Sequence, residues 1–81
     1  MKIDQILETQ SVVTYLQTHN LLALYQKVKA HILAGHYSGA QLRKRRPKTD
    51  DIWYFRINKK FRALAYFEGT TLKVFAIDDH Q

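Results

Sequence analysis

Apolar and polar side chains alternate with a period of two along residues 53–77, and this pattern constrains the fold more than any other feature of the chain. It runs through three successive segments, residues 53–58, 61–68 and 72–77. Such alternation is typical of antiparallel strands that bury one face, and Gly69 can adopt the positive φ of a tight turn. The sequence therefore predicts a three-stranded antiparallel meander. In its last strand, one set of side chains points one way and a second set the other: Leu72, Val74 and Ala76 against Lys73, Phe75 and Ile77.

The loop between the first two strands decides which side chains share a face. A three-residue loop, Asn58 to Lys60, puts Arg56 directly opposite Arg62. A two-residue loop would place Arg62 among the aromatic side chains, where a buried charge is unfavourable. The favoured three-residue register gathers the large apolar side chains on one face: Trp53, Phe55, Ile57, Phe61 and Phe67. The second face carries Tyr54, Arg56, Arg62, Leu64 and Tyr66.

Two arginines directly opposite each other on neighbouring strands repel, which lowers stability unless something screens them. One interpretation of Arg56 and Arg62 is a surface that binds phosphate. The other is an ordinary exposed face, on which each arginine pairs with Asp50, Asp51 or Glu68. The strand pattern alone leaves both interpretations open.

The first half of the chain predicts helices. Five apolar side chains within residues 20–37 recur at helical spacing and form one face: Leu21, Leu24, Tyr25, Val28 and Ile32. Asn20 suits the N-cap of this helix and Gly35 its C-terminal stop. A shorter helix over residues 10–19 has Ser11 as its cap. Its inward side chains are Val12, Tyr15 and Leu16.

These two helices are expected to form a hairpin. Ile3, Ile6 and Leu7 also suit a helical turn, so we expect the hairpin to be the N-terminal part of the fold. Residues 42–46 leave room for a short strand. The predicted fold class is α+β, an N-terminal helical hairpin packed on a small antiparallel β-sheet, in a single domain that spans residues 1–81.

The composition of the 81 residues, 46% hydrophobic, suits one small domain with a modest core. The absence of cysteine excludes disulfides and thiolate metal sites. The first ten residues, MKIDQILETQ, contain no apolar signal core, and no run of apolar residues approaches the length of a membrane span. We therefore expect a cytoplasmic protein that does not interact with a membrane.

Positive charge is concentrated in the second half of the chain. The net charge is +6; residues 42–81 hold ten basic residues against five acidic ones. Nine of those ten lie between Arg43 and Arg62. Such a concentration favours a polyanionic partner, either nucleic acid or an acidic protein. The alternative is a solvated basic face that aids solubility.

The four histidines match no standard metal site, because the spacing of His31 and His36 fits none and there is no HExxH motif. We predict neither a metal nor another cofactor. His80 follows Asp78 and Asp79, and a carboxylate can orient an imidazole for proton transfer. A solvated chain end is the alternative interpretation of His80.

The chain has no Gly-rich phosphate loop and no GxSxG motif. An enzyme built from it would depend mainly on arginine, tyrosine and histidine. That chemistry suits RNA, because a ribose 2′-hydroxyl can attack its adjacent phosphate and guanidinium groups can stabilise the charge that develops there. A weak acid and a weak base then suffice, without a metal.

Residues 52–81, IWYFRINKKFRALAYFEGTTLKVFAIDDHQ, resemble the RelE/ParE superfamily of bacterial toxin–antitoxin toxins, including its HigB branch. The resemblance rests on the R-I-N turn, the aromatic–arginine pair Phe61–Arg62, the V-F-x-I pattern of the last strand and the pair Asp79–His80. It covers the second half of the chain well and the helical half in outline. The strand that usually precedes the helices in this family is not evident in MKIDQILE.

The resemblance implies a toxin of a type II toxin–antitoxin system that inhibits translation by ribosome-dependent mRNA cleavage and is neutralised by a cognate acidic antitoxin. The implied catalytic residues are Arg62, His80, Arg56 and Tyr54: Arg62 stabilises the phosphate, and His80 is the acid or base. The implied RNA-binding residues are Arg43, Lys44, Arg45, Arg46, Lys48, Lys59 and Lys60. The ParE branch implies an alternative, inhibition of DNA gyrase. A non-catalytic basic RNA-binding module is a third possibility.

Overall fold

Five strands and two helices form along residues 1–79, which are the residues that the computed structural model describes. In chain order they are β1 (Gln5–Glu8), α1 (Gln10–Thr18), α2 (Leu22–Leu33), β2 (Arg43–Lys44), β3 (Trp53–Arg56), β4 (Phe61–Glu68) and β5 (Thr71–Asp79). A 3-10 turn, Lys48–Asp50, lies between β2 and β3. Within this part of the chain, no helix has the length and apolar character needed to cross a membrane.

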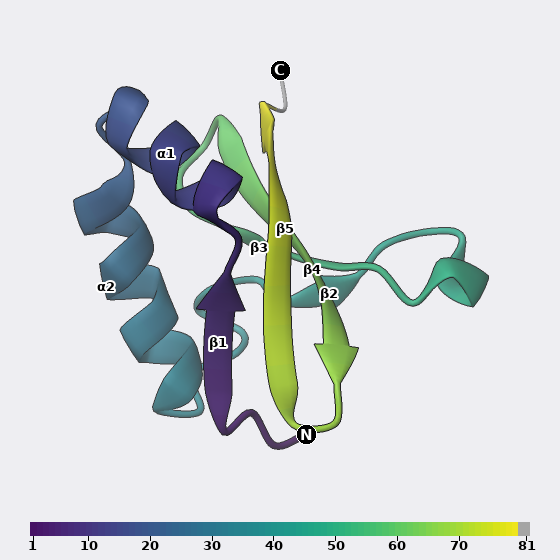
Figure 1. Ribbon diagram of the computed structural model, residues 1–81. Helices are drawn as coiled ribbons and strands as arrows, with labels where there is room; N and C mark the ends of the chain where they lie inside the picture. Colours follow the sequence, from purple (N-terminus) through teal and green to yellow (C-terminus); the bar gives the residue numbers. More distant parts are fainter. Residues whose placement is uncertain (80–81) are drawn as a thin grey trace.

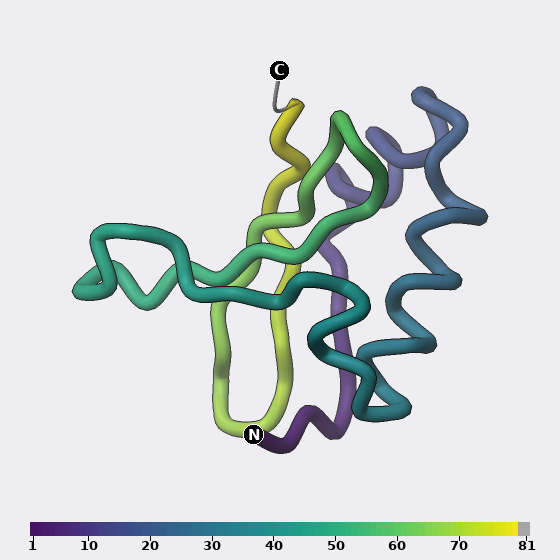
Figure 2. The backbone as a smooth tube through the Cα atoms, turned by 180° about the vertical axis from the view of Figure 1, so that it is seen from behind, coloured from purple at the N-terminus to yellow at the C-terminus, as the bar shows by residue number. Residues whose placement is uncertain are grey.

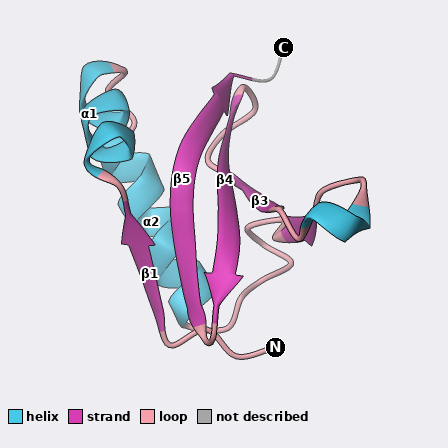
Figure 3. Ribbon diagram, turned by 45° about the vertical axis from the view of Figure 1, so that its right-hand side comes forward, coloured by secondary structure: helices cyan, strands magenta, loops and turns pink. Residues whose placement is uncertain are grey.

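The strands form one mixed sheet in the order β1-β5-β4-β3-β2. β1 is parallel to β5, and every other pair of neighbours is antiparallel. Both helices lie on the same side of the sheet (Figures 1 and 3), and their buried side chains form one core with those of the strands. We call this side the core face and the uncovered side the outer face. The fold is α+β, and β2 falls within the short strand predicted for residues 42–46.

The predicted meander of β3, β4 and β5 is confirmed, together with the predicted register of β3 against β4. Arg56 lies directly opposite Arg62, as expected for a loop of residues 58–60. Asn58 closes this loop, because its Oδ1 accepts hydrogen bonds from two backbone N–H groups further along the chain at 2.9 Å and 2.8 Å. Gly69 turns the chain from β4 to β5 with φ of 63°, also as predicted.

A β-bulge interrupts the alternation of β5. The register of β5 against β4 shifts by one residue, and Phe75 has no residue directly opposite it. A bulge of this kind moves every later side chain to the other face. The prediction that Ala76 shares the face of Val74 is therefore wrong. Ile77 lies opposite Ala63 instead and packs against the core.

The first element is a strand, so the predictions of a helical turn at residues 3–7 and of a helical hairpin as the first element are wrong. β1 pairs with β5 and places Ile6 beside Leu72. Ile3 and Ile6 are buried, whereas Leu7 is exposed. Helical spacing would group all three, but the period of two in a strand separates Ile6 from Leu7. The backbone edge of β5 supplies hydrogen bonds that an isolated helical turn would lack.

α1 forms where it is predicted but begins with a different cap. The side-chain oxygen of Thr9 accepts a hydrogen bond from the backbone N–H of Val12 at 3.2 Å, so Thr9 rather than Ser11 is the N-cap. The Ser11 hydroxyl lies 3.0 Å from that of Thr9. Val12 and Leu16 are buried, and Tyr15 packs against the core, as predicted.

α2 also forms where it is predicted, with Leu21 at its N-cap position and no side-chain capping bond. Asn20, the predicted cap, adopts φ of 55° and turns the chain between the helices; asparagine tolerates this left-handed region better than most residues. Gly35, with φ of 91°, follows the helix end as predicted. Leu24 is exposed rather than inward, because it lies at the margin of the apolar face. The buried side chains of that face are Leu21, Tyr25 and Ile32.

A half-buried carboxylate joins β1 to α2. The Tyr25 hydroxyl and the Lys29 ammonium both donate to Oε2 of Glu8, at 2.7 Å and 2.9 Å. Burial, and then the contact with Glu8, raise the pKa of Tyr25 far above its ordinary value. Both effects favour the protonated hydroxyl, which is the form that donates to Glu8. These bonds hold the end of β1 against the helix layer.

We predict that Glu8→Ala lowers the free energy of unfolding by about 1–3 kcal/mol, because two donors lose a half-buried acceptor. Tyr25→Phe removes one of the two bonds and is expected to cost about 0.5–1.5 kcal/mol. Urea denaturation measures both. The matched control is Glu68→Ala, which breaks an exposed ion pair and should have a much smaller effect. Equal losses in Glu8→Ala and Glu68→Ala would contradict the structural role of Glu8.

Candidate nucleic-acid interface

The antiparallel register gathers arginine and tyrosine side chains on the outer face. Residues directly opposite each other in antiparallel strands point to the same face. Tyr54 lies opposite Leu64 on one side and Arg43 on the other. Arg56 and Arg62 form the next row. We call Arg43, Tyr54, Arg56 and Arg62 the arginine cluster.

Local contacts hold the two central arginines in place. The Arg62 guanidinium lies 5.1 Å from the centroid of the Tyr54 ring, within the range of about 6 Å for a cation–π interaction. Nε of Arg56 donates to the backbone oxygen of Asn58 at 3.1 Å. Both arginines are half-buried. Neither contact neutralises a positive charge.

The carboxylates that were expected to pair with these arginines under the ordinary-surface interpretation do not do so. Asp51 and Glu68 pair with lysines instead, at 2.7 Å and 2.9 Å. Within residues 1–79, no ion pair includes Arg56 or Arg62. An anion from outside, such as a phosphate, can therefore relieve the repulsion between the two guanidinium groups.

Asp78 is a member of this site that the sequence pattern missed. It lies opposite Arg62 on β5, and the bulge is what brings it there. Uninterrupted alternation would have turned Asp78 toward the core together with Val74. A signal was nevertheless present, since that arrangement would bury a carboxylate and expose Ile77.

The seven predicted RNA-binding residues are spread over three places. Arg43 belongs to the arginine cluster. Lys44 lies opposite Trp53 at the start of the loop of residues 45–52, and it pairs with Asp51 of that loop at 2.7 Å, so it belongs to the second place. The loop of residues 45–52 projects beyond the sheet (Figure 2). Its exposed cations are Arg45, Arg46 and Lys48.

The β3–β4 loop forms the third basic place. Lys59 and Lys60 are both exposed there. The Lys60 ammonium lies 3.9 Å from a carboxylate oxygen of Asp79 and 5.4 Å from the centroid of the Phe61 ring. This loop adjoins the row of Arg56 and Arg62, so its charges add to the positive potential of the cluster.

The predicted acid or base, His80, lies outside the described residues. Of the other histidines, His19 stacks on Tyr15 with ring centroids 3.8 Å apart. The ring centroids of His31 and His36 lie 6.0 Å apart. No group of three potential metal ligands occurs within residues 1–79. Around Arg62, the described residues bring together guanidinium, phenol and carboxylate groups.

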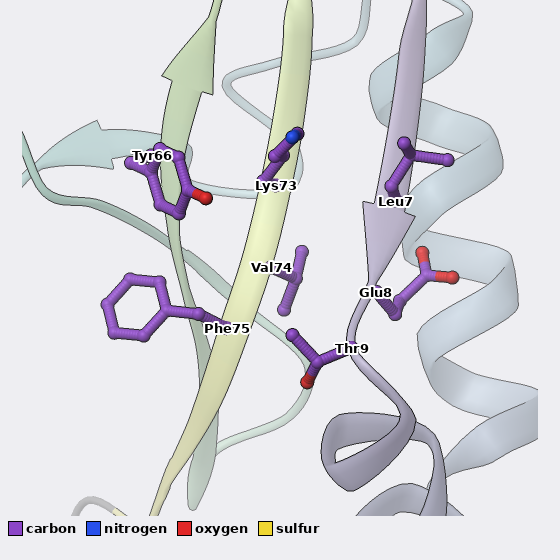
Figure 4. Close-up of a pocket in the computed structure, with 7 residues that line it drawn as sticks. All are labelled: Leu7, Glu8, Thr9, Tyr66, Lys73, Val74 and Phe75. Carbon is purple, nitrogen blue, oxygen red and sulfur yellow. The ribbon is translucent and has the colours of Figure 1, made fainter.

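A hollow on the outer face lies over the junction of β1 and β5, with a volume of ≈ 260 Å³. Tyr66 and Phe75 lie on its β4 side and Leu7 on its β1 side (Figure 4). Lys73 stands at its rim, and the hydrogen bond to Glu68 raises the pKa of Lys73. We call this cavity the outer hollow. The side chains that matter below are Leu7, Tyr66, Lys73 and Phe75. The sequence pattern missed the outer hollow, because it requires the pairing of β1 with β5.

Neither a family model nor a curated protein matches this sequence. The residues and the geometry of the outer face are therefore what indicate a function.

We predict that Arg56→Gln stabilises the protein by about 0.2–1 kcal/mol at low salt, because it removes a like-charge contact across the β3–β4 ladder. The gain should fade in about 1 M salt, where the screening length is about 3 Å. Urea denaturation at both salt concentrations measures it. The matched control, Arg56→Lys, keeps the charge and should show no such gain. A loss of stability in Arg56→Gln at both salt concentrations would mean that the bond to Asn58 outweighs the repulsion.

Proposed function

We propose that this protein is a toxin of a type II toxin–antitoxin system, of the RelE/ParE kind, that inhibits translation by cleaving mRNA on the ribosome. The observation that carries the proposal is the row of Arg56 and Arg62, two guanidinium groups without carboxylate partners among the described residues, with Asp78 at its end. β1 adds support, because it occupies the position of the family strand that the sequence did not reveal.

The proposed reaction is an internal transfer at one phosphodiester. The 2′-oxygen of a ribose attacks the adjacent phosphorus, the bond to the 5′-oxygen of the next nucleotide breaks, and a 2′,3′-cyclic phosphate and a 5′-hydroxyl result. Arg62 and Arg56 stabilise the extra negative charge on the phosphate oxygens as it develops. Donors aimed at such a charge are often the largest single contribution to catalysis.

The two proton transfers need one base and one acid. Asp78 stands across the ladder from Arg62, and a carboxylate there can accept the proton of the 2′-hydroxyl. His80 is the proposed acid for the leaving 5′-oxygen. This assignment rests on the family resemblance, whereas that of Asp78 rests on the register of β4 and β5.

The remaining basic residues are proposed to bind rather than to react. The exposed cations of the projecting loop, Arg45, Arg46 and Lys48, suit the phosphates of ribosomal RNA. An acidic antitoxin is the proposed protein partner, because the arginine cluster carries positive charge that an acidic segment would neutralise.

A binding activity without chemistry is the second candidate. It is favoured by the arginine cluster itself, because guanidinium groups that grip a phosphate need not cleave it. Its two forms are a DNA gyrase inhibitor and a non-catalytic RNA-binding module.

Primer extension on a reporter mRNA in a reconstituted bacterial translation reaction tests the nuclease proposal. The protein should produce ribosome-dependent cuts at A-site codons. Arg62→Ala should reduce the cutting rate by about 10²–10³-fold, the usual effect of losing one donor to a developing charge. Lys27→Ala, which removes an exposed charge from α2, is the matched control and should cut at the normal rate.

Three outcomes would contradict the nuclease proposal. Intact mRNA with a normal yield of protein would remove the translation target. Undiminished cutting by Arg62→Ala would remove Arg62 from the reaction. DNA breaks that depend on gyrase, without mRNA cuts, would favour the gyrase inhibitor.

A further inference from the structure

The outer face exposes apolar side chains that a solvated sheet face does not need. Leu7 is 46% exposed, Tyr66 39% and Phe75 37%. They come from three neighbouring strands, and the rings of Tyr66 and Phe75 have centroids 6.0 Å apart with their planes inclined at 45°. The three side chains therefore form one exposed apolar patch rather than three separate exposed residues.

Phe75 lies at the bulge in β5 but keeps the face that alternation gives it, which is the face of Lys73. No residue of β4 lies directly opposite Phe75. Its ring lies at the outer hollow, where the ring of Tyr66 is its neighbour on β4 (Figure 4). The patch therefore joins an aromatic side chain of β4 to one of β5.

The positive charge that would attract a polyanion lies along the outer face from the patch, at Arg56 and Arg62. Lys73 lines the outer hollow and pairs with the exposed Glu68 at 2.9 Å. Along β4, Tyr66 lies four residues from Arg62, a distance of roughly 14 Å at about 3.4 Å per residue. The outer face thus combines, along one strand, guanidinium groups suited to phosphate and exposed rings suited to a flat apolar group. Single-stranded RNA presents both groups in alternation.

We propose that the outer hollow is a subsite for one unstacked nucleobase of single-stranded RNA, whose backbone continues to a phosphate at the arginine cluster. The base stacks on Tyr66 or Phe75, and Lys73 contacts the adjoining phosphate. The volume of ≈ 260 Å³ lies just below the range of about 300–1,000 Å³ that larger small-molecule ligands occupy. The proposal rests on the proposed function in taking RNA as the ligand, but it requires no cleavage.

The test is equilibrium binding of short fluorescent RNA oligonucleotides with 2′-O-methyl groups at every position, so that no internal attack can occur. Tyr66→Ala and Phe75→Ala should each weaken binding by between about 5-fold and 150-fold, the range for loss of one base–aromatic stack. The dependence of affinity on salt should not change, because no cation is removed. Arg62→Ala should lower that salt slope by about 0.7 instead.

Leu33→Ala is the matched control for an exposed apolar side chain, because Leu33 lies on α2, away from the outer face, and is 42% exposed. It should leave affinity unchanged. Urea denaturation of each variant separates loss of binding from loss of folding.

Abasic substitution identifies the base directly. An oligonucleotide that lacks the base seated in the outer hollow should bind the wild-type protein more weakly, and Phe75→Ala should add little further loss to it. If, at every position, the loss of affinity caused by an abasic site simply adds to the loss caused by Phe75→Ala, the proposal is overturned. Unchanged RNA binding in both Tyr66→Ala and Phe75→Ala would also overturn it and would leave the patch to an apolar, acidic protein segment.

The two proposals can fail separately. A base that couples to Phe75 without any mRNA cutting would support the subsite and contradict the nuclease. Cutting that depends on Arg62, with no effect of the ring substitutions on RNA binding, would support the nuclease and contradict the subsite.

Discussion

Burial of one face of β3 and β4 is the constraint on which the rest of the structure depends. Phe55 and Ala63 have no exposed surface, and they pair in the same ladder that places Arg56 opposite Arg62. A slip of one residue would bury a guanidinium and expose the phenyl ring. The repulsion of the arginines, about 0.2–1 kcal/mol, is small beside the roughly 3–5 kcal/mol that loss of a buried phenylalanine typically costs. Burial of the core face therefore holds the two guanidinium groups close together, although their repulsion alone would separate them.

The single extra residue in β5 determines which of the last side chains of that strand lie on the outer face. It turns Asp78 toward Arg62 and Ile77 toward the core. Without it, the last residues of the strand would present an apolar side chain to solvent and a carboxylate to the core. One irregularity thus places an acidic group beside Arg62 on the outer face.

The sequence was sufficient for features that depend on local periodicity, and insufficient for those that depend on distant partners. The meander, the register of β3 against β4 and the turn at Gly69 follow from alternation and from the cost of burying a charge. The parallel pairing of β1 could not be predicted, because its evidence is a partner strand at the other end of the chain. The N-cap was misplaced because Thr9 and Ser11 are equally suitable hydroxyl residues. The outer hollow was missed because the pairing of β1 with β5 is needed to form it.

The parallel pairing of β1 with β5 has a consequence for how the chain folds. Gln5 and Thr71, which lie side by side and share a hydrogen bond, are 66 residues apart in sequence. Contacts of such high order are slow to form, because the intervening chain loses entropy before the contact provides any stabilisation. During synthesis, β1 is made before β5 and has no partner until β5 follows. The sheet is therefore completed only after β5 has left the ribosome.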